Sequence, residues 1–170
     1  ALYEVVNGER VELPPMSILS NMIAADLFIV LAAYLRTHPV GTAVIEALLI
    51  LDEEANTRRR PDVAFVSAER WPLDRPIPET GDWNVVPDLA IEVASPNDLL
   101  ADVVGKDGEY FAHRVREAWV VIPEEQQVYV YTSPTEVRIQ TRDKSLESPL
   151  LPGLKIPLSD VFARTATPAN

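Results

Sequence analysis

Residues 85–98 read VVPDLAIEVASPND, and the acidic residue Glu92 stands in the middle of the apolar part of this stretch. Bulky and small residues alternate through residues 89–94, a period of two that predicts a β-strand. The alternation places Glu92 on the face that carries two alanines, opposite the face with leucine, isoleucine and valine. An ionised carboxylate in a dry interior costs several kcal/mol unless a cation compensates it. We therefore expect Glu92 to be buried beside a partner.

A second acidic residue, Asp62, opens another short strand in the segment RRRPDVAFVS, residues 58–67. Its neighbours Val63 and Phe65 point away from the face that carries Asp62. If the two strands are neighbours in one sheet, Asp62 and Glu92 converge. Two carboxylates at such a short distance repel each other unless a proton or a metal ion lies between them. The two strands together predict a site for a proton or a cation.

The composition predicts one globular domain over residues 1–170, because 47% of the residues are hydrophobic and a chain of this length can bury a full core. The sequence has no cysteine. This excludes disulfides, thiolate zinc sites and a cysteine nucleophile, and it makes a reducing cytoplasm the expected location. The most apolar segment, residues 22–35, contains Asp26 and is too short to span a membrane, so we expect a soluble protein.

The net charge bears on the partners of the protein. It is −11 at pH 7, and phosphate contacts need a local excess of Lys and Arg. The composition therefore argues against a general surface for nucleic acid. The dense basic run Arg58–Arg60 can be a solvated face, or it can receive a nucleic-acid backbone beside Asp62, and both interpretations stay open.

The first quarter of the chain predicts a hairpin and a helix. Residues 2–13 read as a hairpin, with Asn7 and Gly8 in a type I′ turn. Ser20 is expected to cap a helix that runs to about Arg36. This helix has apolar residues on more than one side, which suggests a homodimer.

The middle of the chain predicts a second hairpin, a loop and a second helix. Residues 42–51 turn back at 52–57 into the strand of Asp62, and the proline-rich residues 71–83 form a long loop of the kind that often borders a site. A helix over about residues 99–114 follows a cap in residues 95–98. Lys106 lies at the margin of its buried arc and Tyr110 one turn further on, so Lys106 can reach back toward the sheet.

The last third predicts strands at residues 117–122, 128–132 and 136–140, and the tail, residues 150–162, is expected to form an edge strand or turn. Together these elements indicate a mixed sheet.

The motifs of the whole chain resemble those of one family. YEVVNGE in the N-terminal hairpin, R-x-PD-V-x-F-V, PDL-x-x-EV-x-SP, a Lys and a Tyr four residues apart, an A-W-V-V strand and a closing LLPG are similar to the Uma-two family of endonucleases. That family is similar in fold to the restriction-endonuclease-like PD-(D/E)XK superfamily. The resemblance implies an α/β (α+β) fold, a mixed β-sheet flanked by helices, with additional N-terminal and C-terminal β-hairpins.

The resemblance also implies a metal-dependent endonuclease site for DNA phosphodiesters. Asp62 and Glu92 match the motif's Mg²⁺ ligands, the backbone carbonyl of Val93 completes such a site, and Mn²⁺ is expected to substitute for Mg²⁺. Glu46 matches an additional acid of the family. The residue two after Glu92, where the superfamily has a Lys, is an alanine, and Lys106 is expected to take its role of positioning water and stabilising charge. The chain also departs from the family at Arg114, where a Gly is common.

Simpler interpretations stand beside these assignments. Glu92 can be a structural carboxylate, Asp62 a surface turn acid and Glu46 a solvated side chain, while Lys106 can extend to solvent from the helix margin. Tyr110 is more often a core residue than a catalytic one. The alternative function is a catalytically inactive member of the same fold that acts as a dimeric protein-interaction module.

Overall fold

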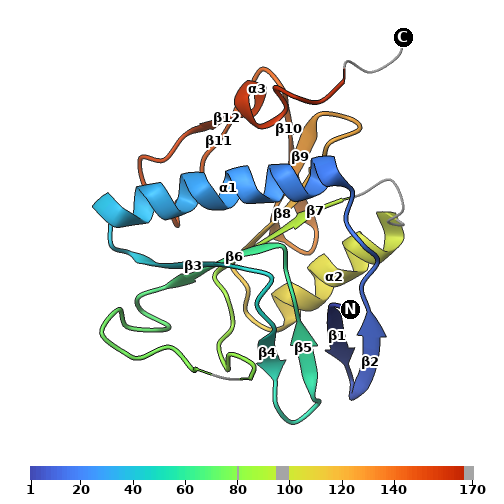
Figure 1. The fold of residues 1–170 in the computed structure, drawn as a ribbon, viewed down its shortest axis with the longest axis vertical. Helices are drawn as coiled ribbons and strands as arrows, with labels where there is room; N and C mark the ends of the chain where they lie inside the picture. The colour runs from blue at the N-terminus through green and yellow to red at the C-terminus, as the bar shows by residue number, and fades with distance from the viewer. Residues whose placement is uncertain (80, 95–99, 167–170) are drawn as a thin grey trace.

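A six-stranded mixed sheet forms the centre of the protein in the computed structural model, which describes residues 1–79, 81–94 and 100–166 (Figure 1). Its strand order is β10-β9-β8-β7-β6-β3. Strands β7 and β8 are parallel, and the other neighbours are antiparallel. The strands are β3 (Gly41–Ile45), β6 (Val63–Ser67), β7 (Leu89–Val93), β8 (Glu117–Ile122), β9 (Gln127–Ser133) and β10 (Glu136–Thr141). The predicted mixed sheet is confirmed.

The alternation in β7 divides the core into two layers. Leu89, Ile91 and Val93 pack in the cluster that contains α1 (Ile18–Thr37). Ala90 packs in the other cluster, on the face covered by α2 (Leu100–Ala112). The small residues of β7 thus leave room on the α2 face, which is the face that Glu92 shares.

Helix α1 begins three residues earlier than predicted. Its N-cap is Ser17, whose Oγ accepts a hydrogen bond from the backbone N–H of Ser20. Ser20 is therefore not the cap: it is buried inside the first turn, and its hydroxyl donates to the carbonyl of Ala94 at 3.2 Å. The prediction that this apolar segment is too short to span a membrane was wrong, since by length and composition α1 could cross one. Here one side of it packs on the central sheet (Figure 1).

A second sheet lies beside the central one, in the order β2-β1-β5-β4 (Figure 1). It contains β1 (Tyr3–Val6), β2 (Glu9–Glu12), β4 (Leu49–Asp52) and β5 (Thr57–Arg59). The N-terminal hairpin is confirmed, with Val6 paired to Glu9 and positive φ angles at Asn7 and Gly8.

The second predicted hairpin is confirmed, with the chain turning back between β4 and β5, but it is divided between the two sheets. Its inner part pairs β3 with β6 in the central sheet, and its outer part pairs β4 with β5 in the other. The first arm breaks at Glu46, which has a positive φ of 46°. The second arm breaks at Pro61, since proline has no N–H for a sheet ladder.

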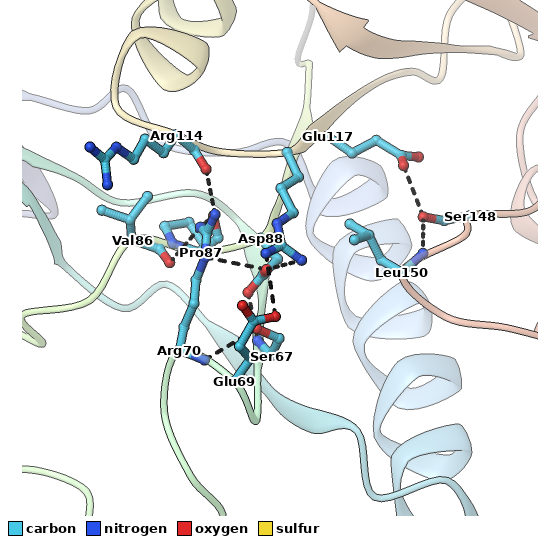
Figure 2. Close-up of polar contacts among 11 residues, drawn as sticks. Ser67, Glu69, Arg70, Val86, Pro87, Asp88, Arg114, Glu117, Ser148 and Leu150 are labelled. Atoms are coloured by element: carbon cyan, nitrogen blue, oxygen red, sulfur yellow. Dashed lines mark hydrogen bonds and ion pairs between the residues drawn. The ribbon is translucent and has the colours of Figure 1, made fainter.

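The C-terminal part of the chain closes the α1 side of the sheet. Strands β11 (Ser145–Leu146) and β12 (Ile156–Pro157) pair, and α3 (Leu158–Val161) follows. The buried carboxylate of Glu117 accepts hydrogen bonds from the Trp119 indole at 2.7 Å and from the Ser148 hydroxyl at 2.9 Å. Figure 2 shows the contact with Ser148 that ties this segment to β8.

Another buried acid, Asp88, holds the start of β7 (Figure 2). It is fully buried, and its Oδ2 accepts a hydrogen bond from the Ser67 N–H at 2.6 Å. The side chains of Arg70 and Arg116 each approach its Oδ1 to 3.4 Å. This acid therefore links the end of β6 to the start of β7, at the opposite end of β7 from Glu92.

Candidate active site

The two acids singled out by the sequence lie on neighbouring segments of the central sheet, Asp62 directly before β6 and Glu92 in β7. β6 pairs with β7 with Val63 opposite Ile91, so Asp62 and Glu92 follow at the next position on the α2 face. Asp62 Oδ2 accepts a hydrogen bond from the N–H of Val93 at 2.7 Å. All three residues line a cleft of about 1140 Å³ between the two sheets and the start of α1. The predicted convergence of the two carboxylates is confirmed.

Helix α2 sends two side chains toward Glu92. The Tyr110 hydroxyl donates a hydrogen bond to Glu92 Oε1 at 2.6 Å, and the Lys106 ammonium lies 3.9 Å from the same oxygen. Tyr110 is fully buried and packs in the core, as expected, and it also supplies this hydrogen bond. The predicted reach of Lys106 toward the sheet is confirmed. The predicted helix cap, residues 95–98, lies outside the described residues.

A further acid of this site, Glu4 on β1, was missed in the sequence. It is 1% exposed, and its Oε1 lies 3.3 Å from Lys106 Nζ. Its Oε2 lies 2.8 Å from Arg59 Nη1, and its Oε1 also accepts a hydrogen bond from the N–H of Arg60. Glu4 thus joins the second sheet to α2. The signal available in the sequence was an acid between the apolar positions of a short strand, within the YEVVNGE motif.

The fourth acid, Glu46, also lines the cleft, at the break after β3. Its backbone N–H donates to the carbonyl of Asp62 at 3.2 Å, and its carbonyl accepts from Arg60 Nη1 at 2.6 Å. The side chain is half-buried. The backbone contacts hold Glu46 next to Asp62 and bring it to the cleft that Asp62 and Glu92 share.

The arginine run fits neither of the two open interpretations. Arg58 pairs with Asp82, Arg59 pairs with Glu4 and Glu109, and Arg60 donates to backbone carbonyls. All three arginines are half-buried. Arg58 and Arg59 neutralise acids inside the protein, and Arg60 is held by backbone carbonyls, so the run does not form a free basic surface. The loop at 71–83 does not border the cleft among the described residues: its Trp71 and Trp83 pack into the core.

Burial and neighbouring charges alter the protonation of the site. Burial raises the pKa of Glu92 to about 8, the Lys106 ammonium opposes this rise, and the carboxylates of Asp62 and Glu4 add to it. Burial lowers the pKa of Lys106, but Glu92 and Glu4 outweigh this and hold it above its ordinary value. Without a bound cation, Glu92 therefore keeps its proton near neutral pH, while Lys106 keeps its charge.

The donor atoms in the cleft suit a divalent cation. Two carboxylates and a backbone carbonyl are oxygen ligands that Mg²⁺ prefers, and Mg²⁺ usually keeps several waters or substrate oxygens besides. Among the described residues no group of three or more His, Cys, Asp and Glu side chains is arranged to hold a metal ion. A cation held by Asp62, Glu92 and the Val93 carbonyl would thus need water or phosphate oxygens to complete its coordination.

The fold and the site define a class: an α+β protein with a nuclease-like fold and a carboxylate-lined cleft at its central sheet. The crystal structure titled "a putative nuclease belonging to DUF820 from Anabaena variabilis" matches with a TM-score of 0.81 and 20% sequence identity, covering 96% of this chain and 91% of that chain. At this identity the likeness shows the shared fold. No curated protein matches the chain.

The family follows from the sequence match. The family model described as "Uma2: Putative restriction endonuclease" matches residues 2–159. The chain belongs to this family. The resemblance noted from the motifs and the predicted restriction-endonuclease-like fold are thereby confirmed.

Proposed function

We propose that this protein is an Mg²⁺-dependent endonuclease that hydrolyses DNA phosphodiester bonds. The observation that carries the proposal is the meeting of Asp62 and Glu92 from neighbouring strands in one cleft, with Lys106 Nζ 3.9 Å from Glu92. The family and the nuclease-like fold support it.

Each residue of the site has a role in this proposal. Asp62, Glu92 and the Val93 carbonyl would hold the cation, which supplies charge neutralisation at the scissile phosphate and a bound water of lowered pKa. Lys106 positions that water and stabilises negative charge as it develops on the phosphate oxygens. Glu46 assists from the edge of the cleft. The Tyr110 hydroxyl fixes the orientation of Glu92 through its 2.6 Å hydrogen bond.

The superfamily's lysine position is occupied here by Ala94, and the position of Lys106 compensates for this change. Lys106 projects from α2 and reaches the same carboxylate that a lysine on β7 would flank. An ammonium acts as a mobile point charge on a long stem, so its position in the chain matters less than its reach.

The test is cleavage of supercoiled plasmid and of single-stranded DNA with Mg²⁺ or Mn²⁺. We expect cleavage by the native protein and none by Glu92→Gln or Asp62→Asn. The matched control is Glu124→Gln, an exposed acid in the turn between β8 and β9, which should cut like the native protein. Calorimetry showing the same Mn²⁺ affinity in Asp62→Asn, Glu92→Gln and native protein would contradict the ligand assignment.

The second candidate is a catalytically inactive, dimeric protein-interaction module of the same fold. The alanine at the superfamily's lysine position and the exposed apolar side of α1 favour it. It predicts a dimer in light scattering and no metal-dependent cleavage of any nucleic acid. Cleavage that depends on Glu92 would exclude it.

A further inference from the structure

The outer side of α1 is apolar and has no partner among the described elements. The side facing the sheet carries the buried residues of the helix, such as Leu27 and Leu31. On the opposite side Ile18 is 82% exposed and Ile29 is 60% exposed. Only 28% of the apolar stretch of α1 is buried. Packing on the sheet therefore accounts for only one side of this helix.

Four exposed residues and the half-buried Met22 form one continuous surface. At about 100° per residue, Ile18, Met22, Ala25 and Ala33 lie within about 40° of the direction of Ile29. We call these five residues the outer face. Its centre is a large side chain next to small ones, since Ile29 has an alanine four residues away on either side. A second helix can approach closely at such a surface, because a bulky side chain can fit beside an alanine.

The two charged residues of α1 indicate what covers this face. They are Asp26 and Arg36, both exposed, and neither has an ion-pair partner in the described part of the chain. We propose that the outer face binds the outer face of a second copy of this chain, with the two α1 helices antiparallel.

The symmetry of such a pair makes the charges complementary. Suppose the two antiparallel helices are aligned so that residue 31 of one copy lies beside residue 31 of the other. Asp26 then lies beside Arg36 of the second copy, and Arg36 lies beside Asp26 of the second copy at the other end of the helix pair. The same alignment places Ile29 level with Ala33 of the second copy. An isologous interface repeats every contact twice, so both ion pairs and both apolar contacts form together.

The charge of the protein favours a second copy over a lipid surface as the occupant. A protein with net charge −11 is repelled by the anionic lipids of a cytoplasmic leaflet, and α1 contributes just one basic residue at its exposed end. A second copy of the chain instead supplies the opposite charge at each end of the helix pair.

The test uses charge reversal and sedimentation velocity of the full chain. The native protein should sediment as a dimer, and Asp26→Arg or Arg36→Asp alone should weaken dimerisation at least tenfold. Combining both substitutions in one chain should restore the dimer. Mixing the two single variants should also restore it, as a heterodimer, because each then offers the charge that the other lacks.

Further variants decide whether this face is the interface. Ile29→Glu should give a monomer with unchanged circular dichroism, while Ile139→Glu, on the exposed edge strand β10, should remain a dimer. A native monomer overturns the proposal, as does a dimer that survives Ile29→Glu or charge reversals that have no effect. Flotation of a monomeric native protein with phosphatidylcholine–phosphatidylserine vesicles would assign the face to a membrane instead and would also overturn it.

Discussion

At the scale of single residues, the protonation of Glu92 links the site to stability. Its pKa in the folded protein is about 8, against an ordinary value of 4.5, chiefly because it is buried. Between these values the folded state retains a proton that the unfolded state has lost. The stabilisation is therefore complete below the ordinary pKa and is lost as pH rises through the folded pKa.

We thus expect the free energy of unfolding of the metal-free protein to fall as pH rises from about 5 to about 8. Glu92→Gln should make this dependence flatter, because an amide carries no titrating proton. Urea unfolding followed by circular dichroism at several pH values measures both slopes. Equal slopes in the two proteins would show that Glu92 is ionised in the fold.

A second residue-scale prediction concerns Glu4, which pairs with Arg59 and Lys106 while 1% exposed. Removing one partner of a buried ion pair leaves an uncompensated charge, so Glu4→Gln should lower the free energy of unfolding by about 3 kcal/mol. The matched change Glu109→Gln should cost less, since Glu109 is 20% exposed and Arg59 keeps Glu4. Urea denaturation distinguishes the two, and equal losses would contradict this role of Glu4.

Some site residues could be predicted from the sequence because the pattern that places them lies within one strand or one helix. The alternation in residues 89–94 was sufficient to place Glu92 on the α2 face, and helix geometry was sufficient to turn Lys106 toward it. Glu4 could not be placed in this way. Its position depends on β1 pairing with β5 through Val5 and Arg58, a contact between distant parts of the chain that no local period encodes.

At the scale of elements, the end of α2 carries a conformational strain. Val115 N–H donates to the carbonyl of Tyr110 at 3.1 Å and Arg114 N–H to that of Phe111 at 3.2 Å. This is the Schellman pattern, whose C′ residue takes a left-handed conformation and is usually glycine. Here that residue is Arg114, with φ 74°. The glycine that the family resemblance leads us to expect here would fit this conformation.

Arg114→Gly should therefore stabilise the protein by about 1 kcal/mol, because glycine adopts the left-handed region without a Cβ clash. The variant keeps the backbone carbonyl of residue 114, which accepts a hydrogen bond from Arg70 Nη2. Arg114→Ala is the matched control and should give no gain, since alanine has the same backbone penalty. Thermal unfolding of the three proteins measures the effect, and a gain in the alanine variant would assign it to the lost side chain.

The elements themselves were largely predictable, and their boundaries and partners less so. Short, largely apolar runs marked β7 and β8 correctly, because strands buried on both faces carry apolar residues at nearly every position. The division of the second hairpin was not predictable, because it depends on the positive φ of Glu46, and a glutamate carries no sequence signal for that conformation. The start of α1 was misplaced because Ser17 and Ser20 are both acceptable caps, and tertiary packing buries the second.

At the scale of the whole molecule, the charge distribution sets how DNA would approach. The net charge is −11, and the arginine run near the cleft is occupied by internal contacts. Long-range repulsion of a polyanion is therefore not offset by a free basic surface there. Repulsion of this kind is screened by salt over a Debye length of about 30 Å at 0.01 M and about 10 Å at 0.1 M.

We accordingly expect the KM for DNA, at saturating Mg²⁺, to fall as monovalent salt rises from about 0.01 M to about 0.1 M. This is opposite to the usual behaviour of proteins that release counterions by contacting phosphates with Lys and Arg. Initial cleavage rates at several DNA concentrations and salt levels measure the slope, with kcat as the internal control for effects on the bound cation. A KM that rises steeply with salt would mean that attraction of DNA by local cations such as Lys106 outweighs its repulsion by the net charge. The electrostatic potential at the cleft would then be positive although the whole molecule is acidic.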